Sequence, residues 1–429
     1  MKDENSLYWI WLSEKCGIAS KEFGRLADRY ENPFDLYRLD EDEIEHLEGI
    51  DEGLKNRLCD KSLESAYAIL RYCKQNRVDI VGYSDPRYPA RLRSIEDPPV
   101  LLYVLGKIPD MNDRLCVGMV GTRKMSEYGR QTAYKISYEL AAANAIVVSG
   151  MALGVDGVSA CGALAAGGLT VAVLGCGISV TYPKEHAKLM REISKHGAVI
   201  TEFSPTEKPI GGNFPKRNRI ISGLCQGVLV VEGDLRSGAL ITAKKAISQG
   251  RDLFALPGKV DDNSSDGPNE LIRNGAQAAL CTEDILRHYD FLYHDRINYG
   301  GLQKAKAKSR SVDDVLRRYG VASLYDRGSC APTRPAEDTV KTEDTVRAAA
   351  ASVPEKTAPQ IKTDESAEIL SSLDETTRRI FSAMPIDRAV SPDSLLLQGA
   401  DMGTVITALT MLEIHGLVSS LPGGLYVRK

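Results

Sequence analysis

The 429-residue sequence lacks the features that would place it in several common classes. No apolar run approaches the ~18 residues of a membrane-spanning helix, and the apolar stretch near the N-terminus is too short and too poorly flanked for a signal peptide. Nine cysteines occur, but the closest two, Cys59 and Cys73, form no C-x-x-C motif. We therefore expect a cytoplasmic protein without a zinc ribbon, a redox motif or a disulfide framework.

The motifs of common enzymes are also missing. The six histidines form no H-E-x-x-H motif, and no G-x-S-x-G sequence occurs. Neither a Walker A motif nor the G-x-G-x-x-G fingerprint of dinucleotide-binding proteins is present. Asp156, Glu202 and Glu232 are candidates either for general acid–base chemistry or for ordering loops, and we favour the ordering role.

The net charge of −4 does not by itself suggest a nucleic-acid partner, but the charge is unevenly distributed. Residues 1–60 carry 8 Lys and Arg against 16 Asp and Glu, whereas residues 210–260 carry 8 against 3. Such asymmetry says more about partners than the total charge does. The basic segment is suited to phosphates, and the acidic segment faces another partner or only solvent.

The central part of the sequence predicts an α/β fold with a doubly wound, Rossmann-like and mostly parallel sheet. Between residues 113 and 290, short runs of Val, Ile and Leu alternate with helical patterns, as expected for strands covered on both faces. The expected strands are Val100–Leu105, Leu115–Val120, Ala145–Ser149, Thr170–Leu174, Ala198–Thr201, Val228–Glu232 and Leu253–Leu256. The expected helices are Glu127–Ala143, Asp156–Ala166, His186–Lys195, Arg217–Cys225, Gly238–Ser248 and Asn269–Arg273.

An all-α domain is expected before this core, over residues 1–80. The segment Leu47–Leu58 has the pattern of a helix–hairpin–helix, and such hairpins can offer backbone N–H groups to a phosphate. Acidic residues surround the turn and would repel a phosphate, so we favour a packing or protein-docking role for this domain. The core domain itself, with the proline-rich connector that precedes it, is expected to span residues 84–290.

Two further parts follow the core. Residues 297–365 are rich in Lys, Ala, Ser, Glu, Thr and Pro, which predicts a flexible linker. Residues 366–429 predict a winged helix with helices at Asp374–Ala383, Pro392–Leu397 and Met402–His415 and two short strands. The third helix carries no Lys or Arg, so we favour protein contact or an accessory role over DNA recognition.

Glycine-rich loops follow the strands of the core and predict a phosphate-binding edge. The carboxyl ends of parallel strands lie at one edge of a sheet, where doubly wound proteins bind their ligands. Glycines allow close approach to the backbone, and helix N-termini offer N–H groups to phosphates. The candidate residues in these loops are Gly121, Thr122, Arg123, Lys124, Ser149, Gly150, Arg236, Ser237 and Gly238.

A second candidate cluster is the run NFPKRNR, from Asn213 to Arg219. Lys216, Arg217 and Arg219 place three cations within four positions, and arginine pairs with phosphate in bidentate fashion. Phe214 could stack on a base, and Asn218 lies between the arginines. Backbone charge and a stacking surface together predict binding of single-stranded DNA.

The motifs resemble those of the DprA/Smf family in order and spacing, closely over residues 84–290. They are YPARLRSIEDPPVLLYVLG, VGTRKMSEYGR, SGMALGVDG, TVAVLGCG, TYP, TEF, NFPKRNRIISGL, VLVVEGDLRSGALITAKKA, FALPG and NELIRNGA. The N-terminal helical domain, which resembles a sterile-alpha-motif (SAM) or helix–hairpin–helix domain, and the winged helix resemble flanks found in that family. One departure is Ala160, which stands where the family has a histidine, so the loop geometry is expected to differ locally.

The resemblance implies a recombination mediator rather than an enzyme. Such a protein binds single-stranded DNA during natural transformation, displaces single-strand-binding protein, loads the RecA recombinase and forms a homodimer through the α/β domain, without a cofactor. The alternative is a nucleotide phosphoribohydrolase-like enzyme, which usually shows P-G-G-x-G-T-x-x-E. In that place the chain reads VEGDLRSGALITA and lacks the glutamate.

Overall fold

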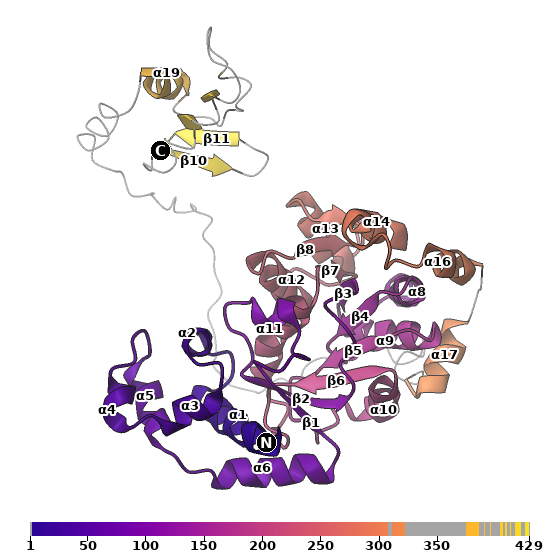
Figure 1. Ribbon diagram of the computed structural model, residues 1–429. Helices are drawn as coiled ribbons and strands as arrows, with labels where there is room; N and C mark the ends of the chain where they lie inside the picture. The colour runs from indigo at the N-terminus through magenta and orange to yellow at the C-terminus, as the bar shows by residue number, and fades with distance from the viewer. Residues whose placement is uncertain are drawn as a thin grey trace, which may run out of the picture. The chain divides into compact units, whose positions relative to one another are not determined.

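The computed structural model describes residues 2–307, 311–321, 375–385, 390, 395, 404–405, 408–409, 412, 417–421 and 425–428. A nine-stranded sheet forms the centre, with the order β1-β2-β6-β5-β4-β3-β7-β8-β9 (Figure 1). The strands are β1 (Asp79–Gly82), β2 (Leu101–Gly106), β3 (Cys116–Val120), β4 (Ile146–Ser149), β5 (Thr170–Val173), β6 (Gly197–Thr201), β7 (Gly227–Val230), β8 (Asp252–Ala255) and β9 (Gln277–Ala278). Strands β3 to β9 are parallel, whereas β2 is antiparallel to both β1 and β6.

Helices cover both faces of the sheet, as the doubly wound fold predicts. One face packs against α8 (Glu127–Ala142), α9 (Val155–Ala165) and α10 (Ala187–Lys195). The other packs against α7 (Ala90–Arg93), α11 (Asn213–Leu224) and α12 (Gly238–Ser248). Side chains of β3 alternate accordingly: Val117 and Met119 belong to the first core, and Cys116 and Val120 to the second.

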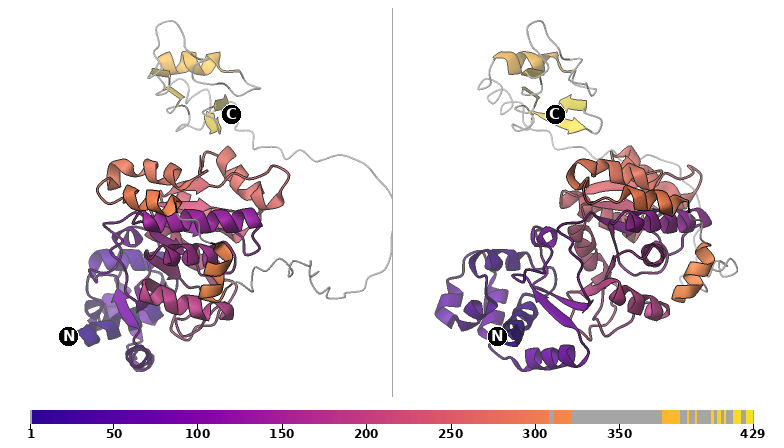
Figure 2. Two further views of the ribbon diagram at one scale, coloured as in Figure 1. Left: turned by 90° about the vertical axis from the view of Figure 1, so that its right-hand side faces the viewer. Right: turned by 45° about the vertical axis from the view of Figure 1, so that its right-hand side comes forward.

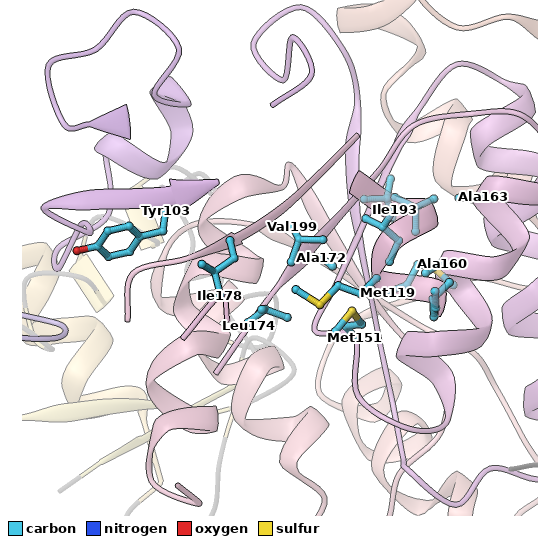
Figure 3. Packing of buried hydrophobic residues seen from close by; sticks show 14 of the residues in the cluster. Tyr103, Met119, Met151, Ala160, Ala163, Ala172, Leu174, Ile178, Ile193 and Val199 are labelled. Atoms are coloured by element: carbon cyan, nitrogen blue, oxygen red, sulfur yellow. The ribbon is translucent and has the colours of Figure 1, made fainter. Parts of the chain in front are cut away.

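In the first of these cores, small side chains of α9 pack against side chains of the strands. Met119, Ala172 and Val199 come from three strands and lie near Ala160 and Ala163 of α9 (Figure 3). All are fully buried. Small residues let α9 approach the sheet closely, which fixes the loops at both ends of this helix.

The N-terminal domain is helical, as predicted, and packs on the antiparallel edge of the sheet. Its helices are α1 (Lys2–Cys16), α2 (Lys21–Arg29), α3 (Pro33–Arg38), α4 (Glu41–Glu45), α5 (Glu52–Cys59) and α6 (Glu64–Gln75). The expected hairpin is formed by α4 and α5, with Gly49 at φ 75° in the turn. Against the sheet, the Trp9 ring fills the space beside Gly82, and Phe23 packs edge-on against Tyr83 at 5.2 Å.

The prediction of a flexible linker from residue 297 is wrong for its first part. After α13 (Asp266–Arg273), α14 (Thr282–His288) and α15 (Asp290–Tyr293), two more helices, α16 (Tyr299–Lys306) and α17 (Val312–Tyr319), pack on the core. Helix α16 contacts α8, and α17 contacts α9 and α10 (Figures 1 and 2). Each helix is polar overall and buries only a narrow apolar stripe, such as Val315, Leu316 and Tyr319 of α17, so composition alone hides it.

The C-terminal part, Thr333–Lys429, is a separate compact unit. It contains α19 (Glu375–Ala383) and the antiparallel pair β10 (Val418–Leu421) and β11 (Leu425–Arg428) around an apolar core. The expected linker beyond residue 321 and most of the expected helices Pro392–Leu397 and Met402–His415 lie outside the described residues. Within the part of the chain that is described, no helix has the length and apolarity needed to cross a bilayer.

Candidate nucleic-acid interface

The loops that the sequence singled out meet where the strand order reverses. From β3 the chain adds β4, β5 and β6 on one side of the sheet, and then returns to add β7, β8 and β9 on the other. The loops after β3 and β7 therefore diverge at their carboxyl ends and leave a crevice between them. In open α/β sheets this switch point is the usual ligand site.

A cleft of about 670 Å³ occupies this position, and we call it the switch-point pocket. Most of the predicted site residues line it: Gly121, Thr122, Arg123, Lys124, Phe214, Arg217, Asn218, Arg236, Ser237 and Gly238. Ser149, Gly150, Lys216 and Arg219 are not among its lining residues. The pocket also includes residues that the sequence reasoning did not select, notably Tyr182, Ile241 and Thr242.

The loop after β3 is held rigidly from beneath. The backbone N–H of Thr122 donates to the carbonyl of Glu232 at 2.8 Å, and its carbonyl accepts from Val155 at 3.2 Å. Gly154 lies directly below at φ 80°, and a Cβ there would approach the Thr122 oxygen to 2.1 Å. These contacts fix the backbone while Arg123 and Lys124 remain exposed at the pocket wall.

The loop after β7 presents a helix N-terminus. Ser237 caps α12, its hydroxyl accepting from the N–H of Ala239 at 3.3 Å. The backbone N–H of Arg236 donates to the carboxylate of Asp234 at 2.8 Å, and the residue is exposed. Nothing lies within 4 Å of a Cβ placed on Gly238, so the first turn of α12 is open to a ligand. The dipole of this helix favours an anion here.

Phe214 forms an aromatic floor in the first turn of α11. Its ring lies 5.4 Å from the ring of Tyr182 and is half-buried. The Arg123 guanidinium lies 5.5 Å from the Phe214 centroid, a distance typical of a cation–π contact. Gly175 makes room for the ring, because a Cβ there would be 2.7 Å from its edge. The pocket thus combines an aromatic ring on which a base can stack with the exposed cation Arg123.

Arg217 lies beneath this floor and is almost fully buried. Its guanidinium donates to the carbonyl of Gly150 at 2.6 Å, to the carbonyl of Val173, and to the side-chain oxygen of Asn218 at 3.2 Å. Burial lowers the pKa of Arg217 to about 10, and the nearby Asp156 carboxylate opposes that shift. Arg217 therefore remains cationic at neutral pH and supplies a fixed positive charge rather than an extended arm.

Two of the candidate carboxylates, Asp156 and Glu232, hold loops of the site in place, which is the role that we favour from the sequence. Asp156 accepts the N–H groups of Gly150 at 2.9 Å and Ala152 at 3.4 Å, and burial raises the pKa of its carboxyl. Glu232 accepts from both the N–H and the hydroxyl of Ser126, the cap of α8. Ser149 is buried behind the pocket with its hydroxyl directed at the carbonyl of Asp156. Ser149 and Gly150 hence support the site from behind.

The prediction that Lys216, Arg217 and Arg219 form one cluster of free cations is wrong. Lys216 is exposed but is not a lining residue, and Arg219 is only 1% exposed. Arg219 is ion-paired with Glu202 and Asp97, inside the protein. The physical reason is the helix itself, which directs neighbouring side chains to different sides.

A second pocket, of about 770 Å³, lies at the opposite edge of the sheet and is also lined by cations. Two of them, Arg87 and Lys195, are paired with Asp79, Asp85 and Glu192. Among the described residues, its Lys107 and Arg114 have no acidic partner within ion-pair distance, and neither have Arg123, Lys124 and Arg236 of the switch-point pocket. Charge alone therefore does not separate the two pockets; the Phe214 ring and the open N-terminus of α12 make the switch-point pocket the candidate site.

Comparison with known proteins assigns the chain to a family. Residues 79–290 match the family model for DNA recombination-mediator protein A, and residues 353–424 match the model for the DprA winged helix domain. The chain is 29% identical to protein Smf of Synechocystis over the whole of both chains. It is 39% identical to the DNA processing protein DprA of Bacillus subtilis, over 51% of this chain and 73% of the relative.

A solved structure agrees with these matches. The X-ray structure of DNA processing protein A from Streptococcus pneumoniae is 33% identical and superposes with a TM-score of 0.56, covering 66% of this chain and 97% of the other. The extent of these matches, together with the winged helix, confirms the resemblance found in the sequence motifs. The chain belongs to the DprA/Smf family of DNA-processing recombination mediators.

Proposed function

We propose that this protein binds single-stranded DNA in the switch-point pocket and, as a mediator, delivers the strand to the RecA recombinase during natural transformation. The observation that carries the proposal is the half-buried Phe214 ring with the exposed Arg123 guanidinium 5.5 Å from its centroid; this guanidinium has no acidic partner among the described residues. A base can stack on the ring when the guanidinium leaves its cation–π position to hold the adjoining phosphate. Bases of a duplex already stack on their neighbours, so this arrangement favours a single strand.

The surrounding groups suit a phosphodiester backbone. Arg236 and the open N-terminus of α12 lie on one wall, and Arg123 and Lys124 on the other. Arg217 adds a fixed charge below. Because phosphate contacts carry no sequence information, we expect binding without strong sequence preference.

The proposal extends to partners. Displacement of single-strand-binding protein and loading of RecA need two copies or two surfaces of the mediator, and a homodimer through the α/β domain supplies both. The edge of the sheet at β9 supports this, because Leu280, two residues after β9, is 74% exposed. We place this activity in the cytoplasm, where RecA acts.

A catalytic role is the alternative, in the form of a phosphoribohydrolase-like activity on nucleotides. That chemistry needs a carboxylate aimed at the ligand. Helix α12, which follows the loop in question, carries no Asp or Glu, and Asp156 and Glu232 are committed to backbone and hydroxyl donors. We therefore favour binding without catalysis.

The test is fluorescence anisotropy with a labelled oligothymidine at several salt concentrations, with duplex DNA as competitor. Each phosphate contact contributes roughly −0.7 to the slope of log K against log salt. The double variant Arg123→Ala/Arg236→Ala should bind more weakly, with a slope reduced by roughly 1.4. The matched control Lys107→Ala/Lys195→Ala removes two exposed cations of the second pocket and should bind like the wild type.

Absence of wild-type binding at low salt would overturn the proposal. In that event, release of a free base from nucleoside monophosphates would test the hydrolase alternative. If the control variant lost as much affinity as the double variant, binding would be a diffuse charge effect and the pocket assignment would be wrong.

A further inference from the structure

Arg219 is the most deeply buried cation of helix α11, in the α/β domain. It does not line the switch-point pocket. Its Nη2 donates to the carboxylate of Glu202, which is 4% exposed, and its Nε lies 3.4 Å from Asp97. Among the described residues its Nη1 has no hydrogen-bond partner. A buried charge of this kind is costly, so it persists only where the geometry of its partners is well defined.

Glu202 also reaches the N-terminal domain. Burial raises the pKa of its carboxyl, and the backbone N–H of Ala19, in the turn between α1 and α2, is among the groups that oppose this shift. Ala19 has φ 60°, an uncommon conformation for a residue with a side chain, so the turn is held in a specific shape. Beside it, Lys21 of α2 forms an ion pair with Glu96 at 2.6 Å. The helical domain is therefore tied to the α/β domain next to Arg219.

The same helix carries the pocket. Phe214 lies in the first turn of α11, Arg217 in the next, and Arg219 two positions later. A movement of α11 that breaks the contact with Glu202 would also move the aromatic floor and the fixed charge. The docking turn of the N-terminal domain and the pocket are thus joined by one rigid element and one buried ion-pair network.

We propose that Arg219 is a positioning residue through which docking of the N-terminal domain and binding of DNA in the switch-point pocket stabilise each other. The proposal rests on the proposed function for its ligand. It assigns Arg219 no contact with DNA, in contrast to the direct phosphate role that its sequence context predicts. Coupling of this kind is reciprocal: DNA should tighten the docking turn, and loosening the turn should weaken DNA binding.

The variant Glu202→Gln separates the two roles by the sign of its effect. If Arg219 positions α11, the loss of the carboxylate charge loosens the helix and raises the Kd for oligothymidine about tenfold. If Arg219 contacts a phosphate, the same variant frees its guanidinium and lowers the Kd. Stronger binding by this variant would overturn the proposal.

Arg219→Lys gives the second discrimination, because lysine keeps the charge but loses the planar fork that spans two carboxylates. We expect Arg219→Lys to raise the Kd by a similar factor while the salt slope stays unchanged. The double variant Glu202→Gln/Arg219→Lys should bind DNA no more weakly than either single variant. A Kd of Arg219→Lys equal to that of the wild type would mean that a positive charge alone suffices, as in a simple phosphate contact, and would contradict the positioning role. Glu270→Gln, which opens a surface pair with Arg273, is the matched control and should bind normally.

Hydrogen exchange of the full chain tests the coupling itself. Without DNA, Glu202→Gln should raise exchange both at residues 17–24 and at residues 213–219, while thermal unfolding shows that the fold is retained. With oligothymidine, wild-type residues 17–24 should become protected. Exchange that rises only in α11, or protection confined to the pocket, would refute the coupling. If the wild type binds no DNA, while Glu202→Gln without DNA still raises exchange at both segments, the proposed function alone is refuted.

Discussion

Arg217 and Arg219 stand two positions apart in one helix, yet they serve different parts of the molecule. Successive residues of an α-helix are turned by about 100°, so these side chains leave α11 on nearly opposite sides. Arg217 contacts the carbonyls of Gly150 and Val173 beneath the pocket, and Arg219 contacts Glu202 and Asp97. The sequence shows the cations as one run because their partners come from segments far away in the chain.

Phe214 is the pocket residue whose role the sequence predicted most directly, and its removal gives a simple test. Phe214→Ala should raise the Kd for oligothymidine by roughly tenfold, because stacking of one base contributes about 1–3 kcal/mol. The salt slope should not change, since no charge is lost. Tyr67→Ala, which truncates an exposed ring on α6, is the control. An unchanged Kd would show that no base stacks on this ring.

The departure at Ala160 has a counterpart elsewhere in the structure. Ala160 is buried in α9, and the imidazole of His186 lies against Gly157 of the same helix. The Nδ1 of His186 is 3.0 Å from the carbonyl of Met151, whose φ of 54° is left-handed. The carbonyl can only accept a hydrogen bond, so Nδ1 carries the hydrogen, and burial, which lowers the pKa of His186, favours the neutral ring. A histidine from another element thus supports the loop that contacts Arg217.

This arrangement predicts an acid-sensitive stability. Burial lowers the pKa of His186 below the ordinary value of about 6.5, so as pH falls below about 6.5 the unfolded state takes up the proton first. The contribution of neutral His186 to the free energy of unfolding is therefore complete above that pH. It is lost as pH falls further, at a rate of at most about 1.4 kcal/mol per pH unit. In urea unfolding between pH 5 and 7.5, the free energy of unfolding of His186→Gln should change less steeply with pH than that of the wild type. His196→Gln, at an exposed position, should keep the wild-type slope, and equal slopes for all three proteins would contradict the prediction.

At the scale of elements, the seven expected strands were predictable to within one or two residues because they are short, buried and apolar. Helix α11 begins at Asn213, four residues before its predicted start, because Pro215 is tolerated in a first turn, where its missing N–H is not needed. Strands β1 and β9 were missed: β1 begins inside the segment expected to be helical, and both residues of β9 are exposed. Helix α16 buries only Leu302 and Ala305, whereas α17 does carry the helical pattern Val312, Val315, Leu316 and Tyr319, which the polar composition of the whole segment concealed.

The loop after β3 depends on the backbone at Gly154, and this gives a prediction for an element rather than a side chain. Gly154→Ala should lower the free energy of unfolding by at least about 3 kcal/mol, because it combines a strained backbone with a clash against Thr122. Gly167→Ala has a similar φ of 74° but open space around it, and should cost only about 1 kcal/mol. Urea unfolding measures both. Equal losses would show that backbone strain alone, and not the packing of the loop, makes glycine necessary.

For the whole molecule, the fold class followed from the alternation of strands and helices, but the order of the strands did not. Local patterns report which faces are buried and carry no information on which strands are neighbours. The position of the switch point between β3 and β7 therefore required the structure. So did the docking of the acidic N-terminal domain beside α11, since the contacts of Lys21 with Glu96 and of Ala19 with Glu202 join segments far apart in the chain.

The free edge at β9 leads to a prediction about assembly. An edge strand presents unpaired backbone groups, and exposed apolar side chains beside it favour pairing with another chain. If the proposed homodimer forms by pairing here, Leu280→Lys places a charge in the interface, and the variant should sediment as a monomer in sedimentation velocity experiments. Tyr67→Lys makes the same exchange at an exposed residue of α6, on the N-terminal domain, and should leave the dimer intact. A Leu280→Lys protein that sediments like the wild-type dimer would exclude the β9 edge as the interface.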